Sequence, residues 1–282
     1  MSTPTIERYG PSALGGEGRR FLELTTTLAR TEFKLRYYGS ILGYVWSLMR
    51  PLLFFSVLYF FFVKILHIAR GPYYGAYLLT GIVLWTFLSE ATGSAVTCLV
   101  QREAMLRKIR FPRMAVPLSV SLTATFNLAM NSIVVLVFAL ASGVTPTILW
   151  LEMIPIVFGF IMLATGLAML LSALYVRFRD VQPIWEVFLS VWFYGSPVMY
   201  PATAYVTPKL PAGTVHFAMI NPVATLLAQV GHAFIDPSGY PTAVGAAHAV
   251  WPVILALALI PGVFALGWWV FAREAPRVAE NL

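Results

Sequence analysis

The sequence predicts an all-α polytopic membrane protein, and three observations support that fold class. Hydrophobic residues make up 59% of the 282-residue chain, and its mean hydropathy is +0.77. Charged residues reach only 11%, far below the roughly 25% of an average soluble domain. Apolar runs of about 18 residues or more recur along the chain, each long enough to cross a bilayer core of about 30 Å as a helix. We therefore expect six transmembrane helices.

The six expected spans cover residues 44–66, 76–98, 114–141, 153–175, 183–200 and 250–271. The fifth is short, and the long segment that follows it, 201–249, is broken by prolines. Within that segment, NPVATLLAQVGHAF (221–234) is apolar again but too short to cross a bilayer. Such a stretch suits a re-entrant or interfacial structure, so we expect outer re-entrant helices between spans five and six.

The basic residues predict the orientation in the membrane. Six spans place both termini on one side, and sixteen of the nineteen Lys and Arg residues then lie on that side. They include seven within 1–50 and five within 102–113. By the positive-inside rule this side is cytoplasmic. The net charge of +7 is then explained by cytoplasmic loops, and no nucleic-acid partner is expected.

A helix is expected before the first span, at 20–39, because its residues segregate with a helical period. One face collects the apolar residues Phe21, Leu24, Leu28 and Leu35. The opposite face collects the charged residues Arg20, Glu23, Arg30 and Lys34. Glu32 and Arg36 lie near the apolar face and have the i,i+4 spacing of a helical ion pair. This pattern favours an amphipathic helix in the cytoplasmic interface; a solvated helix is the alternative. Candidates for contact with lipid head groups are Arg20, Arg30, Lys34 and Arg36.

Residues for catalysis are missing. The GGEGRR stretch at 15–20 lacks the spacing and the lysine of a phosphate-binding loop, so this chain is not expected to hydrolyse ATP. The only aspartates, Asp180 and Asp236, are far apart in sequence. The four histidines are scattered without ligand spacing, and the single cysteine, Cys98, allows neither an intrachain disulfide nor a cysteine metal site. We expect no catalytic residue, no metal site and no cofactor in this chain.

One acidic residue, Glu90, lies well inside an expected span. Intramembrane ionisable residues commonly serve ion pathways, but a single glutamate is little support for proton coupling. A packing or gating role is the preferred interpretation, with coupling as the alternative. Asn127 and Asn131, spaced i,i+4 on span three, are interpreted as interhelical hydrogen-bond residues.

Aromatic residues form 15% of the chain, and several fall inside spans rather than at the membrane interfaces. Flat rings can hold the apolar faces of sugars and still let them slide, so a channel lining is expected for Tyr59, Trp85, Phe87, Glu90, Trp192, Phe193 and Tyr194. Lipid-facing or core positions are the alternative. Gly195 and Pro197 interrupt span five, and a broken helix is tolerated only beside protein or a water-filled cavity. An outer gate is expected at Pro197, Met199 and Tyr200.

Four segments together resemble one family of transporters. RYYGSILGYVWSLMRPLLFF (36–55) resembles the segment that opens the membrane domain of polysaccharide-exporting ABC type-2 permeases. LRKIRFPRMAVPLS (106–119) resembles their basic helix ending in Phe-Pro, and RFRDVQPIWEVFLSVWFYGSPVMYP (177–201) their Arg-Asp loop and short span. NPVATLL (221–227) resembles the Asn-Pro that opens their outer re-entrant helix. The chain is thus identified as similar to permeases for O-antigen, teichoic acid or related lipid-linked glycans.

The resemblance implies a homodimer in the bacterial inner membrane, with two copies of a separate ATPase subunit that binds ATP and Mg. The cargo would be a glycan on undecaprenyl or decaprenyl pyrophosphate. The basic run would be a cytoplasmic coupling helix that contacts the ATPase, through Arg102, Glu103, Arg107, Lys108, Arg110, Phe111 and Pro112. The expected organisation is a flexible N-terminus (1–19), the interface helix (20–39), a six-span domain (40–272) and a cytoplasmic tail (273–282).

Alternatives to this interpretation remain open. One alternative is a drug or small-lipid exporter permease of the same ABC class, which would not need a continuous aromatic lining. An ion-driven flippase would require more intramembrane charge than Glu90 supplies. The basic run could be a positive-inside loop without a partner. Among glycans, mycobacterial galactan, O-antigen and teichoic acid are all compatible, and galactan is preferred on general resemblance.

Overall fold

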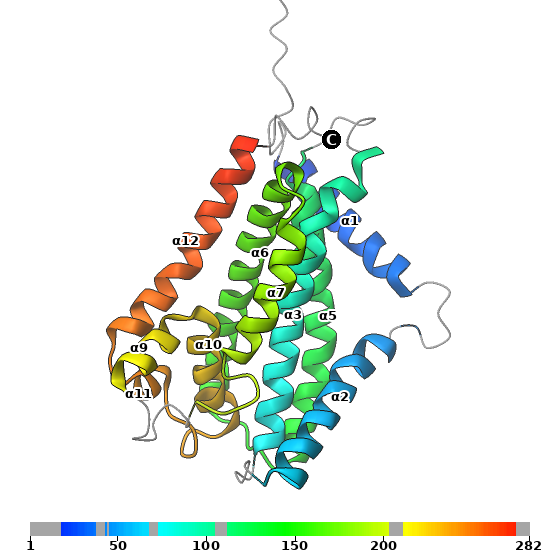
Figure 1. Cartoon of the computed structure of the whole chain (residues 1–282). Coiled ribbons are helices and arrows are strands. Elements are labelled where there is room, and N and C mark those ends of the chain that lie inside the picture. Colours follow the sequence, from blue (N-terminus) through cyan, green and yellow to red (C-terminus); the bar gives the residue numbers. More distant parts are fainter. Residues whose placement is uncertain are drawn as a thin grey trace, which may run out of the picture.

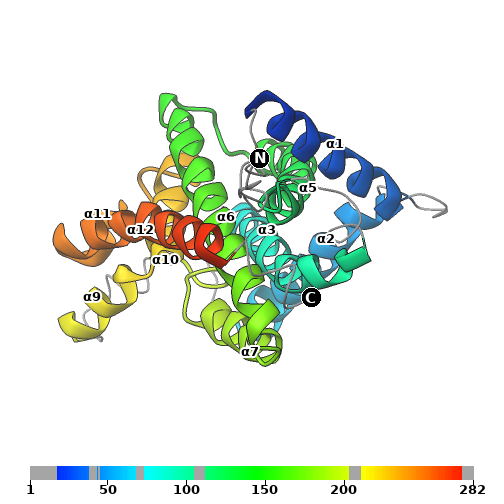
Figure 2. The same ribbon diagram turned by 90° about the horizontal axis from the view of Figure 1, so that it is seen from above.

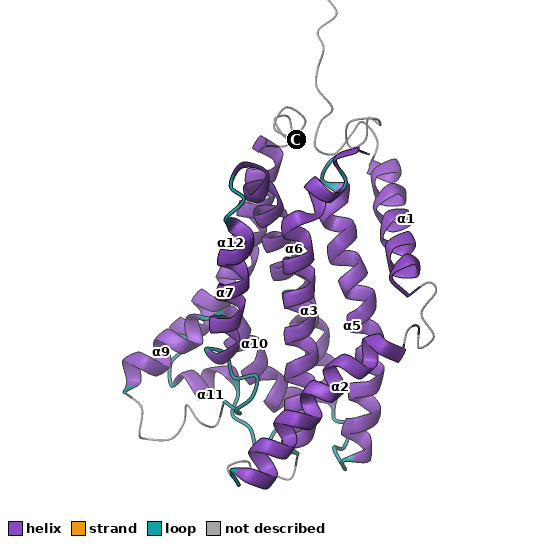
Figure 3. Cartoon of the chain, turned by 45° about the vertical axis from the view of Figure 1, so that its right-hand side comes forward, coloured by secondary structure: helices purple, strands orange, loops and turns teal. Residues whose placement is uncertain are grey.

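A computed structural model of the protein describes residues 18–37, 43, 45–67, 73–104, 112–202 and 211–274. All regular secondary structure in these ranges is helical (Figures 1 and 3). The longer helices are α1 (Gly18–Tyr37), α2 (Val45–Tyr59, continued by a π-helical turn at Phe60–Ile65), α3 (Tyr74–Gln101), α5 (Ala115–Ala141), α6 (Met153–Arg177, preceded by a 3₁₀ turn at Ile148–Glu152), α7 (Val181–Tyr194) and α12 (Trp251–Glu274). The shorter ones are α9 (Ala212–Ile220), α10 (Pro222–Val230, continued by a π-helical turn at Gly231–Ile235) and α11 (Ala243–Ala247).

Helix α3 forms the centre of the bundle. It packs against α2, α5, α6 and α7, and 67% of its most apolar stretch is buried inside the subunit. Seen along the bundle, α1 and α5 lie on one side of α3, and α7 and α12 lie on other sides (Figure 2). An apolar helix that is buried on nearly all faces belongs in the interior of a bundle, which explains the long hydrophobic run at this position.

Five described helices are long and apolar enough to cross a membrane: Val45–Ile65, Tyr74–Gln101, Ala115–Ala141, Ile148–Arg177 and Trp251–Glu274. They match expected spans one to four and six. The expected fifth span is shorter than predicted, because α7 has 14 residues and ends at Tyr194. A sixth candidate arises only if the bent pair Gly213–Ile220 and Pro222–Ile235 is taken as one span. The chain is therefore a multi-pass membrane protein, and the count of six stays a prediction.

Helices α6 and α12 approach each other through glycine. A Cβ atom on Gly166 would lie 2.6 Å from the Cα of Phe264, and one on Gly267 would lie 2.1 Å from the carbonyl oxygen of Gly166. Neither position has room for a side chain. Small residues that let two backbones meet are a common device for joining transmembrane helices, and here they hold α12 against the core.

The two ends of the bundle differ. We call one end the basic end: it carries the start of α1, the end of α12, and Arg102 and Arg177 at the ends of α3 and α6 (Figure 1). The opposite end carries α9, α10 and α11. There, the helices on either side of Asn221 are bent by 92°, at the Asn-Pro pair that the sequence marks. Whether this bent pair is re-entrant from the outer side stays a prediction.

Candidate functional site

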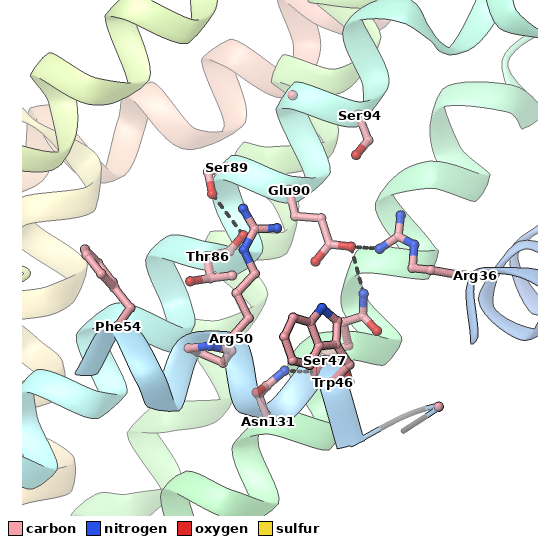
Figure 4. A pocket seen from close by; sticks show the side chains of 14 residues that line it. Arg36, Trp46, Ser47, Arg50, Phe54, Thr86, Ser89, Glu90, Ser94 and Asn131 are labelled. Atoms are coloured by element: carbon pink, nitrogen blue, oxygen red, sulfur yellow. Dashed lines mark hydrogen bonds and ion pairs between the residues drawn. The ribbon is translucent and has the colours of Figure 1, made fainter. Parts of the chain in front are cut away.

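A cavity of about 800 Å³ opens between the end of α1, the start of α2 and the middle of α3 and α5 (Figure 4). Its lining is rich in hydroxyl, amide and charged groups: Arg36, Gly43, Trp46, Ser47, Arg50, Pro51, Phe54, Thr86, Ser89, Glu90, Gly93, Ser94, Asn127 and Asn131. At 1.5 Å per residue, the stretch of α3 that lines it lies about 10 to 23 Å from the last residue of that helix. The cavity is thus a polar space within the depth of an apolar bundle, in the half nearer the basic end.

Glu90 is held by two partners inside this cavity. Its Oε1 atom forms an ion pair with the Arg36 guanidinium from α1 and accepts a hydrogen bond from Asn127 Nδ2 of α5 at 2.7 Å. Asn131 in turn donates through Nδ2 to the backbone oxygen of Asn127, at 2.9 Å. The sequence placed Glu90 in a channel lining and the two asparagines in interhelical bonds. All three side chains line the cavity. The bond of Asn127 to Glu90 joins α5 to α3 as expected, whereas the bond of Asn131 stays within α5, so the interhelical prediction is wrong for Asn131. Arg36 is the residue that pairs with the Glu90 carboxylate.

Arg50 also lines the cavity, on the second turn of α2. It was counted with the cytoplasmic N-terminal residues in the sequence, yet it lies inside the helix that forms the first apolar span. Its side chain extends from α2 across the cavity toward α3 (Figure 4). Arg50 forms no ion pair or hydrogen bond within the described ranges. The described residues that line the cavity therefore carry one positive charge in excess of the Glu90 carboxylate.

A second ion pair ties α1 to the end of α3. Glu32 pairs with Arg102, which also donates from Nη1 to Ser119 Oγ at 3.1 Å. Burial lowers the pKa of the Arg102 guanidinium, because desolvation disfavours its charged form. The expected i,i+4 pair between Glu32 and Arg36 is wrong: each of them pairs instead with an opposite charge on or beside α3. Both partners lie far away in sequence, so local spacing could not reveal them.

The helix α1 otherwise follows its sequence pattern. Phe21 and Ala29 are buried, Leu24 and Leu28 are half-buried, and α1 packs mainly on α5. Leu35 departs from the pattern, since its side chain is 66% exposed. Of the residues expected to contact head groups, Arg30 and Lys34 are exposed and Arg36 points into the cavity. The side chain of Arg20 lies outside the described part of the structure.

Residues expected to couple to an ATPase fall partly outside the described ranges. Arg107, Lys108 and Arg110, which we call the basic triplet, are among them, as is Phe111. The described residues Arg102, Glu103 and Pro112 flank this segment at the basic end of the bundle, and Arg102 and Glu103 are half-buried. The coupling role of the whole segment stays a prediction. What the structure adds is the tie from Arg102 to α1.

Several of the aromatic residues expected to line a channel meet at the contact of α3 and α7. The ring centroids of Trp85 and Trp192 are 5.9 Å apart, and those of Trp85 and Phe193 are 5.5 Å apart. Phe54 of α2 joins them, 5.9 Å from Phe193. Trp85 and Phe193 are each only 8% exposed, while Trp192 is half-buried. These rings therefore form one cluster between three helices.

The remaining aromatic residues lie apart from this cluster. Phe87 is 2% exposed and packs inside the subunit, whereas Tyr194 is 66% exposed. Tyr59 is half-buried beside Tyr74, with ring centroids 6.5 Å apart. Trp185, which the sequence did not single out, donates from Nε1 to Thr92 Oγ1 at 3.1 Å and so fastens α7 to α3. The lining of a channel by these residues stays a prediction.

The segment expected to form an outer gate is tied to the core. Tyr74 donates its hydroxyl to the backbone oxygen of Met199 at 2.7 Å, and Tyr77 donates to that of Pro197. Tyr200 donates to the backbone oxygen of Tyr194 at 3.2 Å. Sequence reasoning missed the role of these two α3 tyrosines in holding the outer segment. A tyrosine at the end of a span is usually interpreted as an interface anchor.

Asn221 joins this outer segment to the bent pair. Its Oδ1 accepts from the backbone nitrogen of Val223 at 3.0 Å, which caps α10. The same oxygen accepts from Trp192 Nε1 at 2.8 Å, and Nδ2 donates to Ser196 Oγ at 2.8 Å. One side chain thus fixes the start of α10 against the end of α7.

Within the described residues, no group of three or more His, Cys, Asp or Glu side chains is placed to hold a metal ion. The fold and this cavity define an all-α multi-pass membrane protein with a polar space among its apolar helices. The chain belongs to the ABC-2 type transporter family, whose sequence model matches residues 23–230. Similar proteins include an O-antigen export system permease protein RfbA from Klebsiella pneumoniae, 26% identical over 73% of this chain and 77% of the relative. Another of the same name, from Myxococcus xanthus, is 30% identical over 76% of this chain and 80% of the relative.

Proposed function

We propose that this chain is the membrane subunit of an ATP-driven exporter that moves a lipid-linked polysaccharide across the bacterial inner membrane. The observation that carries this proposal is the similarity to O-antigen export permeases over about three quarters of the chain, at 26% and 30% identity. A subunit of this class needs a partner that hydrolyses ATP, since its own sequence has no phosphate-binding loop. Two ATPase copies that bind ATP and Mg are therefore part of the proposal.

The proposed working unit is a homodimer. Helix α2 is an apolar span of which only 11% of the most hydrophobic stretch is buried within one subunit. Helix α7 also presents large exposed apolar side chains, among them Ile184, Val187 and Val191. Faces of this kind are covered either by lipid or by another protein surface. A second copy of the chain would cover part of these two surfaces and enclose a passage that neither subunit forms alone, and lipid would cover the rest.

The proposed orientation places the basic end in the cytoplasm. The positive-inside rule favours this side for the ends of α3, α6 and α12, where Arg102, Arg177 and Arg273 lie. Both termini are then cytoplasmic, and the basic triplet faces the ATPase. Helix α1 would lie at the cytoplasmic surface of the membrane, with Arg30 and Lys34 toward anionic head groups.

The proposal is tested by depleting this chain in its native host. Sidedness labelling then shows on which face of the membrane the proposed glycan lies. Full-length lipid-linked polysaccharide should accumulate on the cytoplasmic face, beyond the reach of an impermeant glycosidase added to spheroplasts. Re-expression should restore access to the enzyme. If the glycan stays accessible in depleted cells while drug or small-lipid efflux falls, the chain is instead a drug or small-lipid exporter permease of the same class.

A further inference from the structure

The cavity between α1, α2 and α3 has the charge of an anion site. Among the described residues of its lining, two guanidinium groups, those of Arg36 and Arg50, face one carboxylate, that of Glu90. Arg36 is already paired with Glu90, so the unmatched charge is that of Arg50. An ionised side chain at this depth in an apolar bundle is costly unless an opposite charge or water accompanies it. A bound anion would supply the missing charge, whereas a cation would be repelled.

The donors around Arg50 suit the oxygens of a phosphate group. A guanidinium presents a planar fork of N–H groups that matches two phosphate oxygens at once. Ser47 and Ser94 line the same cavity with hydroxyl groups, which donate further hydrogen bonds to such oxygens. A neutral sugar would gain from the hydroxyl and amide groups but would leave the excess charge unmatched. The combination of fork, hydroxyl donors and net positive charge therefore favours a phosphate ester over an uncharged ligand.

The surroundings of the cavity favour a lipid as the carrier of that phosphate. Next to Arg50, helix α2 continues as an exposed apolar surface that includes Leu53 and Val57, which are 50% and 66% exposed. An amphiphile could place its charged group in the cavity and its hydrocarbon chain along this surface. A volume of about 800 Å³ lies within the usual range of small-molecule sites, enough for more than one phosphate group.

We infer that this cavity binds the phosphate group of a membrane lipid, with Arg50 as the principal ligand and Arg36 as a second one that Glu90 holds in position. Glu90 acts as a competing internal anion. A phosphate that reaches Arg36 has to share this guanidinium with the Glu90 carboxylate or displace the carboxylate from it. The inference deepens the proposed function and rests on it only for the identity of the lipid, for which a polyprenyl pyrophosphate is the expected carrier.

The test is equilibrium binding to the full-length chain in nanodiscs of zwitterionic phosphatidylcholine, in three arms. The probes are undecaprenyl pyrophosphate, phosphatidylglycerol and inorganic pyrophosphate. Arg50→Gln should weaken binding of undecaprenyl pyrophosphate by roughly 10- to 100-fold, the usual loss for a charged hydrogen-bond partner. Arg50→Lys keeps the positive charge but lacks the planar guanidinium. Its affinity for undecaprenyl pyrophosphate should lie between those of the unchanged chain and Arg50→Gln. Glu90→Gln should bind the same lipid more tightly, because the competing carboxylate is gone.

The matched control is Arg273→Gln, which removes an arginine of α12 whose guanidinium lies over the Trp269 ring, 5.5 Å from its centroid. Equal binding by Arg50→Gln and this control would overturn the inference, as would weaker binding by Glu90→Gln in a chain of unchanged thermal stability. Equally tight, Arg50-dependent binding of phosphatidylglycerol would support the phosphate site and assign it to bulk lipid. Because no ATP or transport enters the assay, an Arg50-dependent site in a chain that exports no glycan would contradict the proposed function alone.

Discussion

The ion pair between Glu32 and Arg102 should stabilise the subunit and connect α1 to the segment expected to contact the ATPase. Glu32→Gln removes the negative charge opposite Arg102 and leaves the hydrogen bond from Arg102 to Ser119 in place. The two side chains are 28% and 18% exposed. Breaking a fully buried pair costs about 3 to 5 kcal/mol, and an exposed pair is worth about 0 to 1 kcal/mol. For this partly screened pair we expect a loss of about 1 to 2 kcal/mol in the free energy of unfolding.

A matched control lies on the same helix. Arg19 and Glu23 also form an ion pair, but their side chains are 91% and 63% exposed. Glu23→Gln removes the same charge from the same helix, and we expect it to change the free energy of unfolding by less than about 0.5 kcal/mol. The measurement is unfolding of the full chain in one detergent, with a double-mutant cycle of Glu32→Gln and Arg102→Gln to isolate the pair energy.

Coupling is measured on the same variants in proteoliposomes that also contain the ATPase. If α1 follows movements of the Arg102 segment through this ion pair, Glu32→Gln should lower the amount of glycan exported per ATP hydrolysed, while Glu23→Gln should not. Equal effects of the two substitutions on both stability and coupling would refute the reasoning. The effect should also persist at high salt, because a partly buried pair is screened less than an exposed one.

Other predictions concern the basic triplet, the aromatic cluster and the outer segment. Reversing all three residues of the basic triplet to Glu should reduce export while membrane insertion persists; normal export in that variant would contradict a coupling role. Replacing Trp192 and Tyr194 with Ala should slow glycan passage or cause an ion leak without preventing assembly, as measured by glycan export and ion flux in proteoliposomes. Asn221→Ala removes a helix cap and the partner of the Trp192 indole, and should cost about 2 to 3 kcal/mol of unfolding free energy. Trp192→Phe should reproduce only part of that loss, and equal stability of Asn221→Ala and the unchanged chain would show that the network is not structural.

The long helices could be predicted from sequence because hydropathy acts locally. In a bilayer the backbone N–H and C=O groups of an apolar run have to form their hydrogen bonds within the run, which makes it helical. The length of the run therefore identifies a span. The helix expected at 20–39 is observed over Gly18–Tyr37 for a similar reason, because its periodicity separates one buried face from one exposed face. Its place in the membrane interface stays a prediction. The expected fifth span is longer than the helix that forms there, since the helix ends at Tyr194, before Gly195 and Pro197.

The contacts of the charged residues could not be predicted in this way. Glu32 and Arg36 have a spacing that suits a local pair, yet both have nonlocal partners. Arg50 resembled one more residue of a basic N-terminal region, and only the position of α2 beside α3 places it in a cavity. Which charges meet depends on how the helices are set against one another, and a pattern along one helix does not contain that information.

The positions of the two ion pairs restrict how α1 can move. Glu90 and Arg102 are twelve residues apart in sequence, about 18 Å along the direction of α3, whereas Glu32 and Arg36 are about 6 Å apart along α1. The side chains, mainly those of the two long arginines, have to cover the difference of about 12 Å. A shift of α1 by a few ångströms along α3 would therefore stretch at least one pair beyond contact. Arg36 also lines the cavity, so a shift that moved Arg36 would change the net charge of the cavity. The position of α1 therefore links the segment near Arg102 to the proposed phosphate site.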